Sequence, residues 1–71
     1  MLQTGIYKHY KGQLYKVLHV ATHSETREKL VVYQCLYEDY SIWVRPYEMF
    51  IEQVQLEDGS LISRFEFLHS V

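Results

Sequence analysis

The sequence has only one cysteine, Cys35, so no internal disulfide can form. One proline and three glycines in 71 residues are too few to favour disorder. No apolar run approaches the roughly 20 residues that a membrane helix needs. Residues 1–5 lack the charged and apolar regions of a signal peptide. We therefore expect one folded domain over residues 1–71, in the reducing cytoplasm and without a membrane partner.

An excess of positive charge is also missing. Seven Lys and Arg residues are outnumbered by nine Asp and Glu residues, which gives a formal net charge of -2. Charges of both signs are scattered along the chain, with no run of either. Nucleic-acid binding depends on a basic face that releases counterions from phosphates. We therefore expect no nucleic-acid partner.

Short β-prone runs alternate with turn signals along the whole chain. The runs are Ile6–Tyr10, Leu14–Ala21, Leu30–Tyr37, Tyr40–Arg45, Ile51–Glu57 and Leu61–Leu68. Pro46 has no backbone N–H and ends the fourth run, and one helical turn follows over Tyr47–Phe50, with Met49 and Phe50 in the core. Asp58-Gly59 predicts a type I′ turn that pairs the last two runs. The pattern predicts an all-β fold of five to six short antiparallel strands, as a meander, sandwich or barrel.

Four segments, taken in order, resemble a known family. They are Gly5–Gly12 (GIYKHYKG), His23–Thr26 (HSET), Val31–Tyr33 with Leu36–Tyr37, and Trp43–Pro46 (WVRP) with Met49–Phe50. Together they resemble the bacterial domain of unknown function 1653 family, over Gly5 to about Phe65. The resemblance implies a compact SH3-like β-barrel, found alone or appended to other domains. It implies no activity or ligand, because the family is named for lacking one.

The sequence departs from this family pattern at two positions. Glu38 stands where the family usually has a glycine, so the turn before Tyr40 is expected to differ in type. Ser63 stands where a proline usually precedes the Arg-Phe pair. Both positions are in turns or late strands, so the expected fold is unaffected.

The HSET segment is the first candidate site. On a loop held by a rigid scaffold, His23, Ser24 and Glu25 would form a polar cluster that grips a ligand. The alternative is structural: the Ser24 and Thr26 hydroxyls and the Glu25 carboxylate would satisfy backbone N–H groups of the loop. A triad of Ser24, His23 and Asp39 lacks a nucleophile elbow, and adjacent side chains rarely face each other, so no catalytic role is expected.

Metal binding is the next candidate chemistry. The potential ligands are His9, His19, His23, His69 and Cys35. They are spread over strands, a loop and the tail, and no Cys-x-x-Cys pair accompanies them. Structural zinc needs four well-spaced ligands. We expect neither a metal nor another cofactor.

The Trp43-Val44-Arg45-Pro46 segment carries the second candidate site. Strand alternation puts Trp43 and Arg45 on one face, where the guanidinium can stack beside the indole. With Tyr33 and neighbouring tyrosines this makes a patch suited to a protein segment or a small polar ligand. The structural alternative makes Trp43 the main core residue and pairs Arg45 with Glu25 or Glu48.

Two classes of function follow from these observations. The first is a small binding module whose contact residues are His23, Ser24, Glu25, Tyr33, Trp43 and Arg45. The second is a structural or accessory domain that oligomerises or attaches to a larger complex, because a chain this small buries only about 60% of its surface and a partner can supplement its core. We expect a monomer or a weak homodimer.

Overall fold

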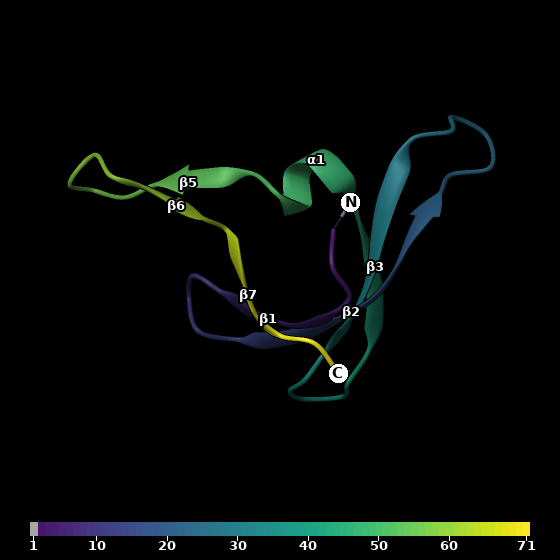
Figure 1. The fold of residues 1–71 in the computed structure, drawn as a ribbon, viewed down its shortest axis with the longest axis horizontal. Helices are drawn as coiled ribbons and strands as arrows, with labels where there is room; N and C mark the ends of the chain where they lie inside the picture. Colours follow the sequence, from purple (N-terminus) through teal and green to yellow (C-terminus); the bar gives the residue numbers. More distant parts are fainter. Residues whose placement is uncertain (1) are drawn as a thin grey trace.

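The computed structural model describes residues 2–71, which form antiparallel strands, the turns and loops that join them, and one short helix (Figure 1). The elements in chain order are β1 (Gly5–His9), β2 (Leu14–Thr22), β3 (Lys29–Cys35), β4 (Ile42–Pro46), α1 (Tyr47–Phe50), β5 (Gln53–Gln55), β6 (Leu61–Ser63) and β7 (Phe65–His69). The predicted β-strand fold is confirmed, and its helical turn begins and ends where the sequence predicts. Within residues 2–71, no helix is both long and apolar enough to cross a membrane.

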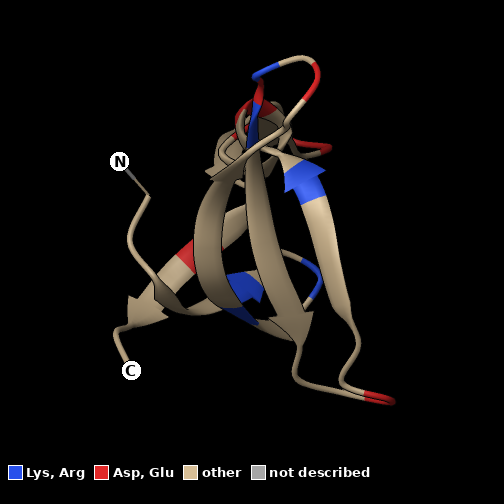
Figure 2. Ribbon diagram, turned by 90° about the vertical axis from the view of Figure 1, so that its right-hand side faces the viewer, with Lys and Arg blue, Asp and Glu red and all other residues tan. Residues whose placement is uncertain are grey.

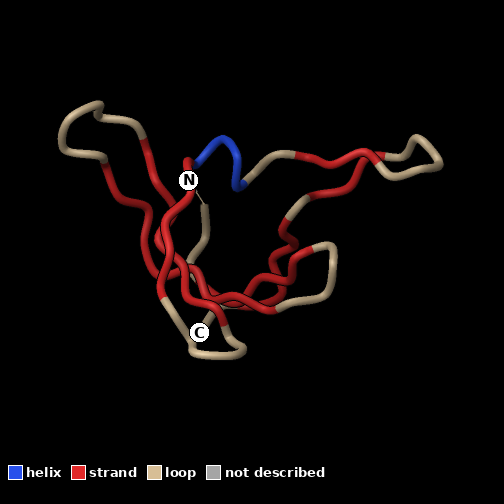
Figure 3. The backbone as a smooth tube through the Cα atoms, turned by 180° about the vertical axis from the view of Figure 1, so that it is seen from behind, coloured by secondary structure: helices blue, strands red, loops and turns tan. Residues whose placement is uncertain are grey.

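Five strands form one sheet in the order β4-β3-β2-β1-β7, and β5 and β6 form a separate two-stranded sheet. All of the paired strands are antiparallel. The sheet curls, and the β2–β3 and β5–β6 hairpins extend to opposite sides of it (Figure 3). Its outer strands, β4 and β7, do not pair with each other in the described chain. The expectation of a closed barrel is therefore wrong, and the likeness to SH3 domains stays a prediction.

The last predicted strand, Leu61–Leu68, is two strands with different partners. β6 pairs with β5, with Val54 opposite Ile62, whereas β7 pairs with β1, with Tyr7 opposite Phe67. The chain changes sheets at Arg64, because Phe65 is buried against the main sheet while Leu61 stays exposed. The outer strand β7 is therefore added to β1 and leaves the β5–β6 hairpin on its own.

The turn of this hairpin also differs from the expected type. A type I′ turn needs positive φ at both central residues, and in the described chain Gly59 has φ +89° while Asp58 is not in that region. The N–H of Gly59 donates to the carbonyl of Leu56 (2.9 Å), and the N–H of Leu56 donates to the carbonyl of Ser60 (2.8 Å). These bonds define a three-residue loop in which glycine takes the left-handed position.

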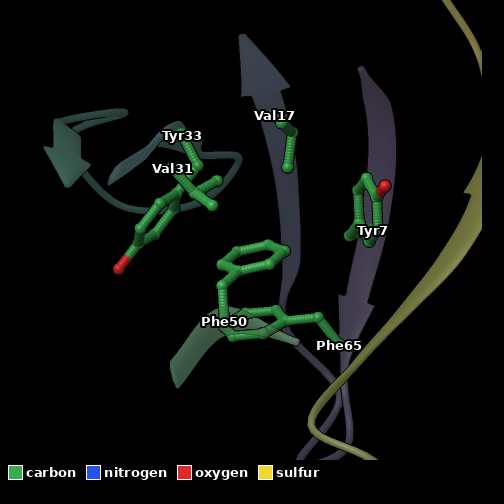
Figure 4. Close-up of a cluster of buried hydrophobic side chains, with 6 residues drawn as sticks. All are labelled: Tyr7, Val17, Val31, Tyr33, Phe50 and Phe65. Atoms are coloured by element: carbon green, nitrogen blue, oxygen red, sulfur yellow. The ribbon is translucent and has the colours of Figure 1, made fainter. Parts of the chain in front are cut away.

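The core lies in the curl of the sheet (Figure 4). Its buried members are Tyr7, Val17, Val31, Tyr33, Phe50 and Phe65. The Phe50 and Phe65 rings stack in parallel with centroids 4.1 Å apart, which locks α1 against β7. Burial of Phe50 is as predicted, but Met49 is exposed. A single helical turn presents only one side to a sheet, and α1 uses it for Phe50.

Candidate functional site

Beside this core, the sheet and the β3–β4 turn line a pocket of about 300 Å³. Its lining residues are Tyr15, Tyr33, Cys35, Tyr37, Glu38, Asp39, Ser41, Trp43 and Arg45. We call this the Trp43 pocket. It contains Tyr33, Trp43 and Arg45 from the candidate contact set. The strand register brings them together, because β4 pairs with β3 with Trp43 opposite Tyr33 and Arg45 opposite Val31. Since Val31 and Tyr33 are buried, Trp43 and Arg45 lie on the core side of the sheet.

Trp43 is at the mouth of the pocket and is 57% exposed. Its indole N–H donates a 2.7 Å hydrogen bond to Oγ of Ser41. The backbone N–H of Ser41 in turn donates to Oδ1 of Asp39 (3.1 Å), and hydrogen bonds from Ser41 lower the pKa of the Asp39 carboxyl. The alternative in which Trp43 is the main core residue is therefore wrong. The indole is an exposed ring whose orientation is set by its hydrogen bond to Ser41.

Arg45 is partly buried deeper in the same pocket. Its Cζ lies 5.5 Å from the centre of the Phe65 ring, so its cation–π contact is with a core residue rather than with Trp43. Among residues 2–71 the ion pair within 4.0 Å is Arg64 with Glu52, at 3.6 Å. The expected pairing of Arg45 with Glu25 or Glu48 is therefore wrong. Arg45 is a cation in the pocket with no carboxylate of the described chain within 4.0 Å of its guanidinium.

Hydroxyl groups face the pocket from β2 and from the β3–β4 turn. The hydroxyls of Tyr15 and Tyr37 are 2.9 Å apart and share a hydrogen bond. This bond, followed by burial, raises the pKa of Tyr37 above its ordinary value. The Tyr37 phenol therefore stays protonated at neutral pH, and a hydroxyl pair of this kind can offer a donor and an acceptor to a polar ligand.

Three cationic side chains lie close enough to His9 to affect its pKa. His9 packs edge-on against Phe65, with ring centroids 4.9 Å apart, and the Phe65 ring also carries the Arg45 contact. Burial lowers the pKa of His9, and the charges of Arg45, Arg64 and Lys11 lower it further. Its Nδ1 accepts the backbone N–H of Lys11 at 3.1 Å. Burial and these three charges therefore favour the neutral form of His9.

The HSET loop joins β2 to β3 at the tip of their hairpin (Figure 1), whereas the β3–β4 turn that lines the pocket follows the other end of β3. Nδ1 of His23 accepts the backbone N–H groups of Glu25 (3.1 Å) and Thr26 (3.2 Å). Oγ1 of Thr26 accepts the N–H of Glu28 (3.2 Å). The structural alternative expected Ser24 and Glu25 to accept hydrogen bonds from backbone N–H groups of the loop. The imidazole of His23 accepts most of these bonds instead. The structure does not bring these three residues to Trp43 and Arg45.

The comparisons with known proteins agree with this fold. The model of a family described as a protein of unknown function (DUF1653) matches residues 5–67. The chain belongs to the DUF1653 family. The crystal structure of a DUF1653 protein from Bordetella bronchiseptica is similar, with a TM-score of 0.87 and 33% identity over 99% of this chain and 91% of that chain. No curated protein matches the chain. The resemblance drawn from the sequence is confirmed.

The β3–β4 turn, where we expected a departure from the family pattern, forms one wall of the pocket. Glu38, where the resemblance led us to expect a glycine, has φ +55°, and Tyr40 has φ +57°. Both are in the left-handed region that glycine adopts most easily. Glu38 thus keeps a glycine-like backbone while adding a carboxylate to the pocket wall, beside Asp39. Figure 2 shows this acidic turn at one end of β4 and a basic position near the other.

Sequence reasoning missed several lining residues. Tyr15 was visible in the alternation of its strand, and Cys35 alternates with Val31 and Tyr33. The turn residues Glu38 and Ser41 carried no such signal, because the course of a turn is not periodic. Metal binding has no support from the geometry: across residues 2–71 no three His, Cys, Asp or Glu side chains group closely enough to hold an ion.

Proposed function

We propose that this DUF1653 domain is a small binding module that holds a carboxylate of a protein segment or small polar ligand in the Trp43 pocket. The observation that carries the proposal is Arg45, a partly buried cation on the Phe65 ring with no carboxylate partner in residues 2–71. A guanidinium offers a planar pair of donors that matches a carboxylate.

The rest of the pocket suits the groups next to that carboxylate. The exposed Trp43 ring offers a flat apolar face, and aromatic rings are frequent anchors in binding sites. The Tyr15 and Tyr37 hydroxyls can exchange hydrogen bonds with an amide. Glu38 and Asp39, in the turn, provide acceptors for an amide N–H or a cation. A residue with a free carboxylate, an amide and an apolar side chain fits this distribution.

The HSET loop has no direct part in this proposal. His23, Ser24 and Glu25 would touch only a protein segment long enough to run along the β2–β3 hairpin. The module requires no metal or other cofactor. We place it in the cytoplasm, where the buried thiol of Cys35 would stay reduced.

The test uses the one tryptophan of the chain as a reporter inside the site. Trp43 fluorescence is followed while N-acetylphenylalanine is added, and again with its primary amide, which differs only in lacking the carboxylate. A hydrogen-bonded charge pair contributes about 1.5–3 kcal/mol, so the acid should bind at least about tenfold more tightly. Equal responses to the two compounds, or no saturable response to the acid, would contradict the proposal.

Variants of Arg45 then assign the carboxylate contact. Arg45→Gln should remove the preference for the acid and leave the circular dichroism spectrum unchanged, and Arg45→Ala should abolish binding. Arg45→Lys keeps the charge but loses the paired donors, so it should retain part of the preference. Arg27→Gln, in the remote β2–β3 loop, is the matched control and should bind like the wild type. Unfolding of both Arg45→Gln and Arg45→Lys would show that Arg45 is architectural.

A further inference from the structure

β4 is an outer strand of the sheet, and its free edge carries backbone groups without partners in the sheet. The N–H of Cys35 donates to the carbonyl of Ser41 at 2.9 Å. Because bonded pairs alternate along antiparallel strands, Trp43 and Arg45 then bond to β3. The backbone carbonyls of Ile42, Val44 and Pro46 therefore point away from the sheet. The N–H groups of Ile42 and Val44 point the same way.

This edge has only part of the protection that sheets usually give to outer strands, because β4 is short and ends at Pro46 but has no charged side chain on its outer face. Exposed apolar residues, Ile42, Trp43 and Val44, occupy consecutive positions. The one charged residue of β4, Arg45, faces the core side, where its guanidinium lies on Phe65. Pro46 at the end of the strand removes a single donor. An unpaired edge of this kind is a template for another strand.

We propose that the occupant is β4 of a second copy of this chain, paired antiparallel about a two-fold axis at Val44. Val44 of each copy then exchanges both of its backbone hydrogen bonds with Val44 of the other. The N–H of Ile42 donates to the carbonyl of Pro46 in the second copy, and the symmetric bond forms as well. Because Pro46 has no N–H, the only bonds missing from this register are those from Pro46 to the carbonyl of Ile42 in the other copy.

Side-chain complementarity selects this register and a second copy as the occupant. With Val44 opposite itself, Trp43 is directly opposite Arg45 of the second copy, twice. Residues opposite each other in such non-bonded positions have Cα atoms about 4.5 Å apart, so each indole can contact a guanidinium that has no carboxylate partner in residues 2–71. A register with Arg45 opposite itself would bring two like charges together. The two Trp43 pockets would become neighbours across the axis.

The experiment measures self-association without any ligand. Sedimentation velocity of the full chain, up to millimolar concentration, should show a monomer–dimer equilibrium, because the interface of one strand pair is small. Val44→Lys places two like charges opposite each other and should raise the dimer Kd at least about tenfold. Leu61→Lys is the matched control, since Leu61 is 60% exposed against 59% for Val44 but lies in β6. It should leave the Kd unchanged.

A cysteine at the axis tests the register itself. Val44→Cys should cross-link into a covalent dimer under copper–phenanthroline in air, much faster than Leu61→Cys, and this readout stands even if Val44→Lys fails to fold. A monomer at every concentration, or a dimer unaffected by Val44→Lys and not cross-linked through position 44, would overturn the proposal. Assemblies that grow beyond the dimer would also overturn it, because a two-fold interface closes. These measurements contain no ligand, so their outcomes are distinguishable from those of the carboxylate titration.

Discussion

The indole N–H of Trp43 donates a 2.7 Å hydrogen bond to the hydroxyl of Ser41, two residues earlier in the chain. Ser41 is itself held by Asp39 through its backbone N–H. An exposed tryptophan is thereby fixed by the turn that precedes its strand. The β3–β4 turn and the Arg45 position in β4 thus set the two walls of one pocket.

Removal of the Ser41 hydroxyl should loosen the indole without unfolding the chain. Because Ser41 supports an exposed ring, Ser41→Ala should change the free energy of unfolding by no more than about 1 kcal/mol. Time-resolved fluorescence anisotropy should show faster motion of the indole. The affinity for N-acetylphenylalanine should fall by roughly fivefold, the equivalent of one hydrogen bond.

Ser60→Ala is the matched control for this prediction. Ser60 donates to Asp58 through both its N–H (2.9 Å) and its hydroxyl (2.6 Å), in a turn of the β5–β6 hairpin away from Trp43. It should leave both the anisotropy and the affinity unchanged. An indole equally rigid in Ser41→Ala and in the wild type would show that the hydrogen bond does not hold the ring.

Substitution of Gly5 should destabilise the fold through a steric clash. A Cβ built on Gly5 would be 2.5 Å from the carbonyl oxygen of His69, in the backbone next to β1, and Gly5 has φ +140°. Gly5→Ala should therefore lower the free energy of unfolding by about 2 kcal/mol or more in urea titrations. Gly12 has φ +109° but no atom within 4 Å of its added Cβ. Gly12→Ala should cost less, and equal losses would contradict the steric argument.

His9 should make the domain sensitive to acid. Its pKa is lowered in the folded state by burial and by Arg45, Arg64 and Lys11, so below the usual value of about 6.5 the unfolded chain binds the proton more readily. Stability due to His9 is then present above that value and lost as pH falls toward the folded pKa. Urea titrations should show this decline, and His9→Gln should reduce it. A His9 ring that titrates in NMR above its usual pKa would contradict the assignment.

The sequence was a reliable guide wherever a pattern is local. Alternation and turn residues located the strands, and the position of Pro46 located α1. The partner of Phe65 could not be predicted, because nothing in the run Leu61–Leu68 marks the change of sheet at Arg64. The prediction of a closed barrel was wrong for a similar reason. Whether the outer strands of a sheet meet depends on the curl of the whole sheet, which no local pattern encodes.

The candidate site was also predictable only where its residues are close together in the sequence. Trp43 and Arg45 share a face by alternation, and register with β3 adds Tyr33. The HSET loop was joined to them on composition alone, although it lies at the other end of the hairpin. That Arg45 forms no ion pair within 4.0 Å in residues 2–71 could not be predicted from a sequence in which nine acidic residues are available.

The most direct measurement is chemical-shift mapping of the whole ¹⁵N-labelled chain during titration with N-acetylphenylalanine. Saturable shifts are expected at the Trp43 indole N–H, at Nε–H of Arg45 and in the backbone of the β3–β4 turn. The N–H groups of Glu25 and Thr26, in the HSET loop, should not move. Shifts confined to the HSET loop, with Trp43 and Arg45 unaffected, would contradict the assignment of the Trp43 pocket as the binding site.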